Sequence, residues 1–298
     1  MPNTLMNVSS QMADTADTAG RSVVRVDARR RMPASGIIWN AEGVIVTAHH
    51  VVRRDEDITV GLADGRTVAA ALVGRDPTTD LAVLRIQADG LPPLPPAADR
   101  PRVGELVLAL ARPGRTIQAT LGVVSAVGEE GWRTPMGGQI DTYLQTDVLM
   151  YPGFSGGPLV SAGGQMVGLN TSAILRGVSL TIPASTVRRV VEALLAHGRI
   201  RRGYLGVSTQ RVQLPDPLAR ELAQDTGLLV AAVEPGGPAD RAGLLLGDTI
   251  VGLDDMPIRR HEDLLHSLTP ERVGTTASLR IIRSGKVEAL PVVVGEQS

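Results

Sequence analysis

Between residues 21 and 183 the chain is a series of short apolar runs separated by turn residues, and this pattern constrains the fold more than any other feature. Runs at 36–39 and 44–52 flank the turn Asn-Ala-Glu-Gly, and runs at 58–62 and 66–74 flank Ala-Asp-Gly. Apolar runs joined in this way are typical of β-hairpins. Further runs lie at 81–86, 105–111, 117–127, 141–148, 158–160, 165–169 and 178–183. Short strands at this spacing predict a mainly β fold, a barrel or a sandwich.

A second, smaller unit is predicted after this β-rich region. Residues 185–197 carry apolar side chains at helical spacing, with Ser185 as the expected N-cap and Gly198 as the expected stop. Beyond a linker at 198–203, turn signals, a helix at about 261–268 and two closing strands indicate an α+β unit. We therefore expect an N-terminal segment at 1–20, a β-rich domain at 21–200 and an α+β domain at 201–298.

Composition argues against several classes of partner. The net charge of −1 and the 2% aromatic content give no reason to expect nucleic-acid binding. Arginine clusters at 29–31 and 201–202 are interpreted as solvated surface or linker. There is no cysteine, and the two histidines of HEDLLH are five residues apart where a zinc-binding helix needs four. We expect neither a metal nor a cofactor.

The N-terminus gives the only indication of location. It has neither a basic start nor an apolar run, so no signal peptide is apparent, and no stretch approaches the length of a membrane span. The expectation is a soluble protein of the cytoplasm. The alternative is an exported protein whose leader has been removed.

Ser155 lies among glycines in YPGFSGGPLV, and the chain supplies partners for its hydroxyl. Serine becomes a nucleophile when a histidine takes its proton and a carboxylate holds that histidine. His49 and His50 follow one predicted strand, and Asp76 and Asp80 precede another. Each has a structural interpretation taken alone, but the order His, Asp, Ser is that of chymotrypsin-like proteases.

The string GFSGG also fits the nucleophile elbow of α/β-hydrolases. That motif requires a helix directly after the serine and the order Ser, acid, His. Here Gly156-Gly157-Pro158 leads into a predicted hairpin. The elbow interpretation is therefore rejected.

Residues from about 36 to 296 resemble the HtrA/Deg family of serine proteases. The matching stretches are SGIIWNAEGVIVTAHHVV, VGRDPTTDLAVLRI, LGVVSAVG, YLQTD, GFSGGPLV, VGLN, LTIPAS and RRGYLGV. The resemblance implies a chymotrypsin-like double β-barrel followed by a small α+β PDZ domain. It selects His50 over His49 and Asp80 over Asp76 as partners of Ser155.

The same resemblance implies roles for the glycine-rich loop. The N–H groups of Gly153 and Ser155 would form the oxyanion hole, and Asp147 is interpreted as structural. Phe154 departs from the pattern, since HtrA relatives usually carry asparagine there. Leu149 and Met150 are expected to form a shallow apolar pocket that accepts Val, Ala, Ile or Leu before the scissile bond.

In the second domain Tyr204, Leu205, Gly206 and Val207 resemble the carboxylate-binding loop of PDZ domains. Their backbone would hold a peptide C-terminus against the following strand, with the helix at 261–268 as the opposite wall.

The resemblance implies an ATP-independent endopeptidase that cleaves unfolded or misfolded proteins and is regulated through its PDZ domain. The alternative is a catalytically silent or latent barrel, or a chaperone, that binds peptides through the PDZ groove, and an esterase is a distant third. A homotrimer is expected from the family alone, because residues 1–38 carry no aromatic side chain.

Overall fold

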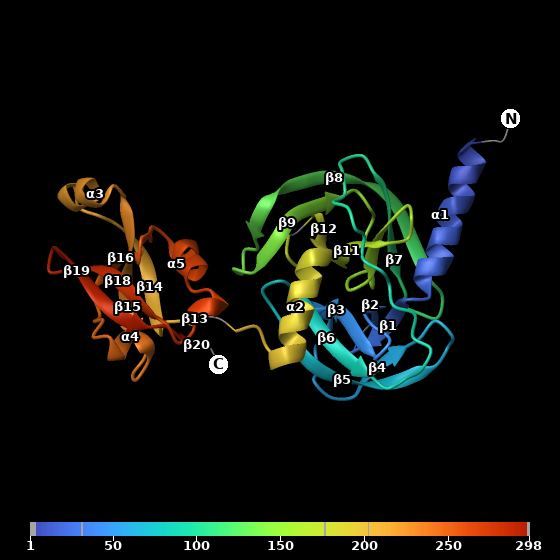
Figure 1. Cartoon of the computed structure of the whole chain (residues 1–298), viewed down its shortest axis with the longest axis horizontal. Coiled ribbons are helices and arrows are strands. Elements are labelled where there is room, and N and C mark those ends of the chain that lie inside the picture. The colour runs from blue at the N-terminus through green and yellow to red at the C-terminus, as the bar shows by residue number, and fades with distance from the viewer. Residues whose placement is uncertain (1–3, 31, 176, 202, 297–298) are drawn as a thin grey trace. The chain divides into compact units, whose positions relative to one another are not determined.

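The computed structural model describes residues 4–30, 32–175, 177–201 and 203–296. It divides into two compact units, Met1–Ile200 and Arg201–Ser298 (Figure 1). Most of the regular elements of the first unit are strands, so the predicted mainly β fold is confirmed.

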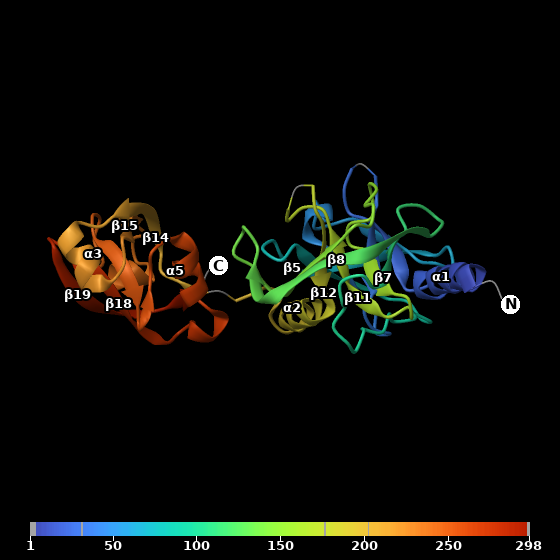
Figure 2. The same ribbon diagram turned by 90° about the horizontal axis from the view of Figure 1, so that it is seen from above.

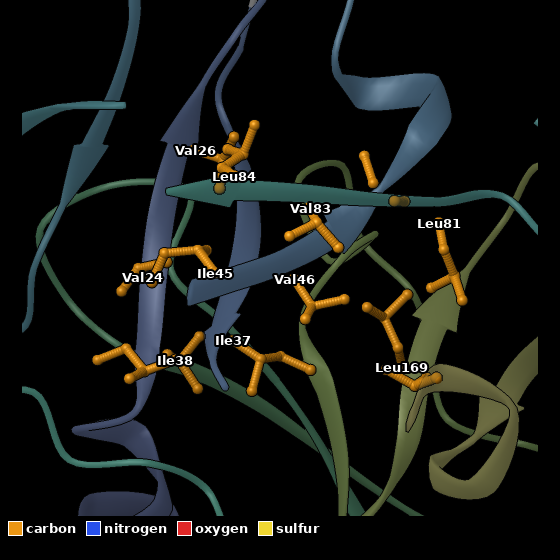
Figure 3. Close-up of a cluster of buried hydrophobic side chains, with 14 of the residues drawn as sticks. Val24, Val26, Ile37, Ile38, Ile45, Val46, Leu81, Val83, Leu84 and Leu169 are labelled. Atoms are coloured by element: carbon orange, nitrogen blue, oxygen red, sulfur yellow. The ribbon is translucent and has the colours of Figure 1, made fainter. Parts of the chain in front are cut away.

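Six strands of the first unit close into one barrel, in the order β1-β2-β3-β6-β5-β4. They are β1 (Val23–Asp27), β2 (Ala34–Ile38), β3 (Val44–Ala48), β4 (Ile58–Gly61), β5 (Thr67–Asp76) and β6 (Leu81–Ile86). Buried branched side chains line these strands, and the register places Ile45 of β3 directly opposite Ile38 of β2 and Leu84 of β6 (Figure 3). Both predicted hairpins are present, since β2 pairs with β3 and β4 with β5.

The next six strands close into a second barrel, in the order β10-β11-β12-β9-β8-β7. They are β7 (Leu106–Ala111), β8 (Gln118–Arg133), β9 (Gln139–Thr146), β10 (Pro158–Ser161), β11 (Met166–Thr171) and β12 (Ser179–Pro183). Alternate residues of β9 are buried, as expected for a strand with one face in a core. The predicted double β-barrel is confirmed.

Two longer helices accompany the barrels (Figure 2). In α2 (Ala184–His197) the predicted stop is confirmed, because Gly198 has the left-handed φ of 71°. The predicted N-cap is wrong. Strand β12 runs directly into the helix, so Pro183 is the N-cap and Ser185 lies inside the first turn.

The helix α1 (Thr4–Gly20) was not predicted from the sequence. Only a thin stripe of apolar residues at four-residue spacing, Val8, Met12 and Ala16, is half-buried along it. Such a stripe is too narrow to stand out from the surrounding Ser, Thr and Asp residues.

The second unit is a small α+β domain. Its sheet has the order β14-β15-β16-β18-β19, with β17 paired to β16, so β14 is an edge strand. The helix α5 contacts β14. The elements are β13 (Gly203–Tyr204), β14 (Val207–Gln213), α3 (Asp216–Leu222), β15 (Thr226–Val233), α4 (Pro238–Arg241), β16 (Thr249–Leu253), β17 (Met256–Pro257), α5 (His261–Ser267), β18 (Thr276–Arg283), β19 (Lys286–Val293) and β20 (Gly295–Glu296), with a 3₁₀ turn η2 (Pro270–Arg272).

Candidate active site

Strand pairing in the first barrel brings one histidine and one aspartate together. The 3₁₀ turn η1 (His49–Val51) follows β3, and Asp80 directly precedes β6. Because Ala48 of β3 pairs with Leu81 of β6, the segments beyond these two residues are neighbours. The His49 N–H donates to the Asp80 carbonyl oxygen at 2.9 Å, which fixes the approach.

The buried Asp80 carboxylate accepts several hydrogen bonds. The His50 backbone N–H donates to Oδ1, and His50 Nδ1 lies 2.8 Å from Oδ2. The Thr171 hydroxyl, at the end of β11, also donates to Oδ2. A carboxylate on Nδ1 favours the tautomer with the proton there, which leaves Nε2 free to accept one. This is the arrangement of a histidine prepared to act as a general base.

The neighbouring His49 and Asp76 have structural surroundings. Burial lowers the pKa of His49, an effect that the Asp80 carboxylate opposes, and so favours its neutral form. The buried Asp76 carboxylate accepts from the hydroxyls of Thr78 and Thr79, both at 2.7 Å, in the turn before β6. This geometry agrees with the choice of His50 and Asp80 over these two residues.

Ser155 follows a tight turn whose type is dictated by its residues. The Phe154 N–H donates to the Tyr151 carbonyl oxygen at 3.1 Å, and Gly153 has a φ of 97°. Pro152 and Gly153 therefore occupy the two central positions of a type II turn, which favours proline first and requires a positive φ second. The type II turn thus explains why the glycine-rich loop begins with the residues YPGF.

Ser35, a buried residue of β2, holds this turn from the first barrel. Its hydroxyl donates to the Gly153 carbonyl oxygen at 2.7 Å, and its N–H donates to the Ser155 carbonyl oxygen at 3.2 Å. In the described part of the chain, no acceptor contacts the N–H groups of Gly153 and Ser155. Two free backbone donors on one turn are what an oxyanion hole requires.

The Gly153→Ala variant is expected to lower kcat for peptide cleavage by about a hundredfold to a thousandfold, the effect of losing one oxyanion donor. A Cβ at this position would lie 2.6 Å from Pro113 Cβ, on a backbone that disfavours side chains. Gly164→Ala is the matched control, because Gly164 has a φ of 80° and its Cβ would meet nothing closer than 3.8 Å. Steady-state kinetics of both variants check the prediction. Equal losses would assign the effect to backbone strain alone.

The Ser155 hydroxyl lies 3.2 Å from the hydroxyl of Ser172, just beyond β11. Within the described residues this is the hydrogen-bond contact of the hydroxyl, rather than His50. Bonds between nucleophile and base are often long in enzymes without substrate and shorten when it binds. Ser35, Thr171 and Ser172 were not predicted as site residues, because a hydroxyl on a strand gives no sequence signal of its own.

The remaining residues predicted around Ser155 fall into three environments. Phe154 is buried in the second barrel's core, with its ring edge-on to Tyr151 at 6.0 Å between centroids. Met150 packs against the same core, whereas Leu149 is 57% exposed. The Asp147 carboxylate accepts from the Val123 N–H at 2.6 Å, a contact that agrees with its structural interpretation.

The predicted carboxylate-binding loop of the second unit leads into the edge strand β14. Gly206 has a φ of 78°, and the carbonyl oxygens of Leu205 and Gly206 accept from Ala239 and Glu234. In this described stretch no acceptor contacts the N–H groups of Leu205 and Gly206. Adjacent free N–H groups of this kind form concave sites for anions.

Comparison with known proteins identifies the family. Residues 34–169 match the trypsin-like peptidase domain, and residues 203–294 match the PDZ domain. The structure of the HtrA-type protease AlgW with a decapeptide has 30% identity and a TM-score of 0.75, over 96% of this chain and 99% of that one. The chain belongs to the HtrA family of serine endoproteases. A second structure, that of the serine endoprotease from Yersinia pestis, has 32% identity and a TM-score of 0.76, over 96% of this chain and 98% of that one.

Curated HtrA relatives correct the expected location. The probable periplasmic serine endoprotease DegP-like of Pseudomonas fulva is 39% identical over 88% of this chain and 55% of its own length. The protein of the same name from Chlamydia trachomatis is 34% identical over 92% and 56%. The chain thus spans about half the length of these relatives. Their names place them in the periplasm, so the expected cytoplasmic location is wrong, and the comparison points to export.

Across the described residues, no helix is both long and apolar enough to cross a membrane.

Proposed function

We propose that the chain cleaves peptide bonds with Ser155 as nucleophile, His50 as general base and then acid, and Asp80 as the group that orients His50. Ser155 Oγ would attack the carbonyl carbon as His50 takes its proton. His50 would then deliver that proton to the leaving amine, and water would release the acyl group by the same route. The N–H groups of Gly153 and Ser155 would stabilise the negative oxygen in both steps.

The observation that carries the proposal is the Asp80–His50 pair, 2.8 Å apart, together with a serine whose turn leaves two backbone donors free. Consecutive residues link the two, since Thr171 donates to Asp80 and the hydroxyl of Ser172 contacts that of Ser155. A catalytically silent peptide-binding barrel would need none of these arrangements. The latent alternative supposes an oxyanion hole that is not formed at rest, and the type II turn with its two free N–H groups favours the active form instead.

For substrates, we propose unfolded polypeptides cleaved after Val, Ala, Ile or Leu, with Leu149 and Met150 at the apolar pocket. The PDZ loop at Tyr204, Leu205, Gly206 and Val207 would bind peptide C-termini, as the free N–H groups in it support. Assembly into a homotrimer is part of the proposal, and light scattering after size-exclusion chromatography measures it.

Digestion of reduced, unfolded casein tests the activity, with and without a peptide that ends in an apolar residue. A fluorophosphonate probe added in parallel should label Ser155, located by mass spectrometry. The expected result is cleavage after small or medium apolar residues and stoichiometric labelling of Ser155. An unlabelled Ser155 with intact casein under both conditions would refute the endopeptidase, and fragments ending mainly in Lys or Arg would refute the apolar pocket.

A further inference from the structure

A basic pocket lies on the first barrel, lined by Arg29, Arg30, Met32, Arg53 and Arg54. It is formed by the loop between β1 and β2 and by the loop between η1 and β4. The Arg53 N–H donates to the Ala28 carbonyl oxygen at 2.9 Å, so the two loops are joined. The sequence interpretation of residues 29–31 as solvated surface did not anticipate this pocket, and Arg31 lies outside the described residues.

One loop contacts the turn before Ser155, and the other follows His50 in the chain. The first loop ends at Pro33, whose carbonyl oxygen lies 3.2 Å from where a Cβ on Gly153 would be, and the next residues form β2 with Ser35. The second loop begins just after His50, where the Val52 N–H donates to the His49 carbonyl oxygen at 3.0 Å. Each loop of the pocket is therefore joined, within a few residues, to a segment that positions the reacting centre.

The positive charge of the pocket is only partly neutralised. Arg54 forms an ion pair with Asp27 at 3.4 Å. Asp55 of the same loop forms its ion pair with Arg75, which is not among the pocket residues. Arg29 donates to a carbonyl oxygen, that of Met32, at 2.7 Å. Among the described residues, no carboxylate lies within ion-pair distance of Arg29, Arg30 or Arg53.

The chemistry of the reaction decides which part of a substrate meets this pocket. His50 must give its proton to the leaving amine, so the chain after the scissile bond passes the segment that bears His50. Leu149 and Met150, in the second barrel, precede the turn at 151–154, which we call the catalytic turn. They would face the residue before the scissile bond. The arginine pocket belongs to the first barrel, as His50 does, and its two loops join segments that hold the reacting centre.

We propose that this pocket binds an aspartate or glutamate side chain of the substrate within three residues after the scissile bond. The inference rests on the proposed endopeptidase and adds a determinant of its specificity. Exposed guanidinium groups such as those of Arg30 and Arg53 pair with carboxylates in a bidentate manner. The partly exposed Met32 would cover the methylene groups of the same side chain.

Two fluorogenic peptides test the proposal. They are identical up to and including a valine before the scissile bond and differ after it, with Asp and Glu in one and Asn and Gln in the other. The wild type is expected to have about a tenfold higher kcat/KM for the acidic peptide, a ratio that shrinks in 0.5 M NaCl because salt screens exposed charges. In the double variant Arg30→Gln/Arg53→Gln the ratio should fall to about one.

Arg188→Gln is the matched control, because Arg188 is an exposed arginine on α2, and it should keep the tenfold ratio. Equal cleavage of the two peptides by the wild type would overturn the inference and leave the endopeptidase standing. An unchanged ratio in the double variant would place the preference elsewhere and would also overturn it. If the wild type cleaves neither peptide, the endopeptidase fails, and this inference fails with it.

Discussion

Ser155→Ala is expected to lower kcat for peptide cleavage by about a millionfold, which is the usual consequence of removing the nucleophile of a serine protease. The remaining rate over that in water would come from the free N–H groups on the catalytic turn. Ser172 cannot replace the lost hydroxyl. It lies beyond β11, outside the turn that carries those donors, although its Oγ is 3.2 Å from that of Ser155. Kinetics with a fluorogenic peptide in large enzyme excess measure a loss of this size.

Ser161→Ala is the matched control for this variant. Ser161 ends β10, six residues after Ser155, and its hydroxyl donates to Gln165 at 2.8 Å in a surface hairpin. Its replacement should leave kcat within a few-fold of the wild type. Activity in the Ser155→Ala variant would assign the nucleophile to another residue.

Asp80→Asn is expected to lower kcat by about ten-thousandfold at neutral pH, with little change in fold. The asparagine amide has nearly the shape of the carboxylate, but it carries no charge to stabilise the protonated His50. Its NH₂ group can also face His50 Nδ1 and so stabilise the wrong tautomer. The pH dependence of kcat in this variant, followed with the same fluorogenic peptide, measures the loss.

Asp76→Asn is the comparison that separates catalysis from folding. Asp76 is as deeply buried as Asp80, but its hydrogen bonds go to Thr78 and Thr79. Losing a buried hydrogen-bond partner costs about 1–3 kcal/mol of stability, so the melting temperature should fall while kcat stays within a few-fold. Similar losses of kcat in the two variants would contradict the role given to Asp80.

Most of the first unit could be predicted because its strands carry their signals locally. The turn residues at 40–43 and 63–65 separate apolar runs, and each run pairs with the next one along the chain. The site residues were harder. The sequence alone left two histidines and two aspartates as candidates, and only the resemblance to HtrA proteases separated them.

The structure explains why these candidates are difficult to tell apart. His49 and His50 both contact Asp80. His49 does so through its backbone N–H, whereas His50 does so through both its backbone N–H and its ring. Ser35 and Thr171 could not be assigned from the sequence, because long-range strand register, rather than any local motif, brings their hydroxyls to the site. The helix α1 escaped prediction for a different reason, since its apolar stripe is thin.

The burial of Phe154 has a thermodynamic consequence for the enzyme. The catalytic turn is held partly by a hydrocarbon ring in an apolar core, and the contribution of such burial hardly depends on pH or ionic strength. It depends on temperature instead, because burial of apolar surface changes the heat capacity and stabilises less on cooling. Cold should therefore loosen the turn before salt does.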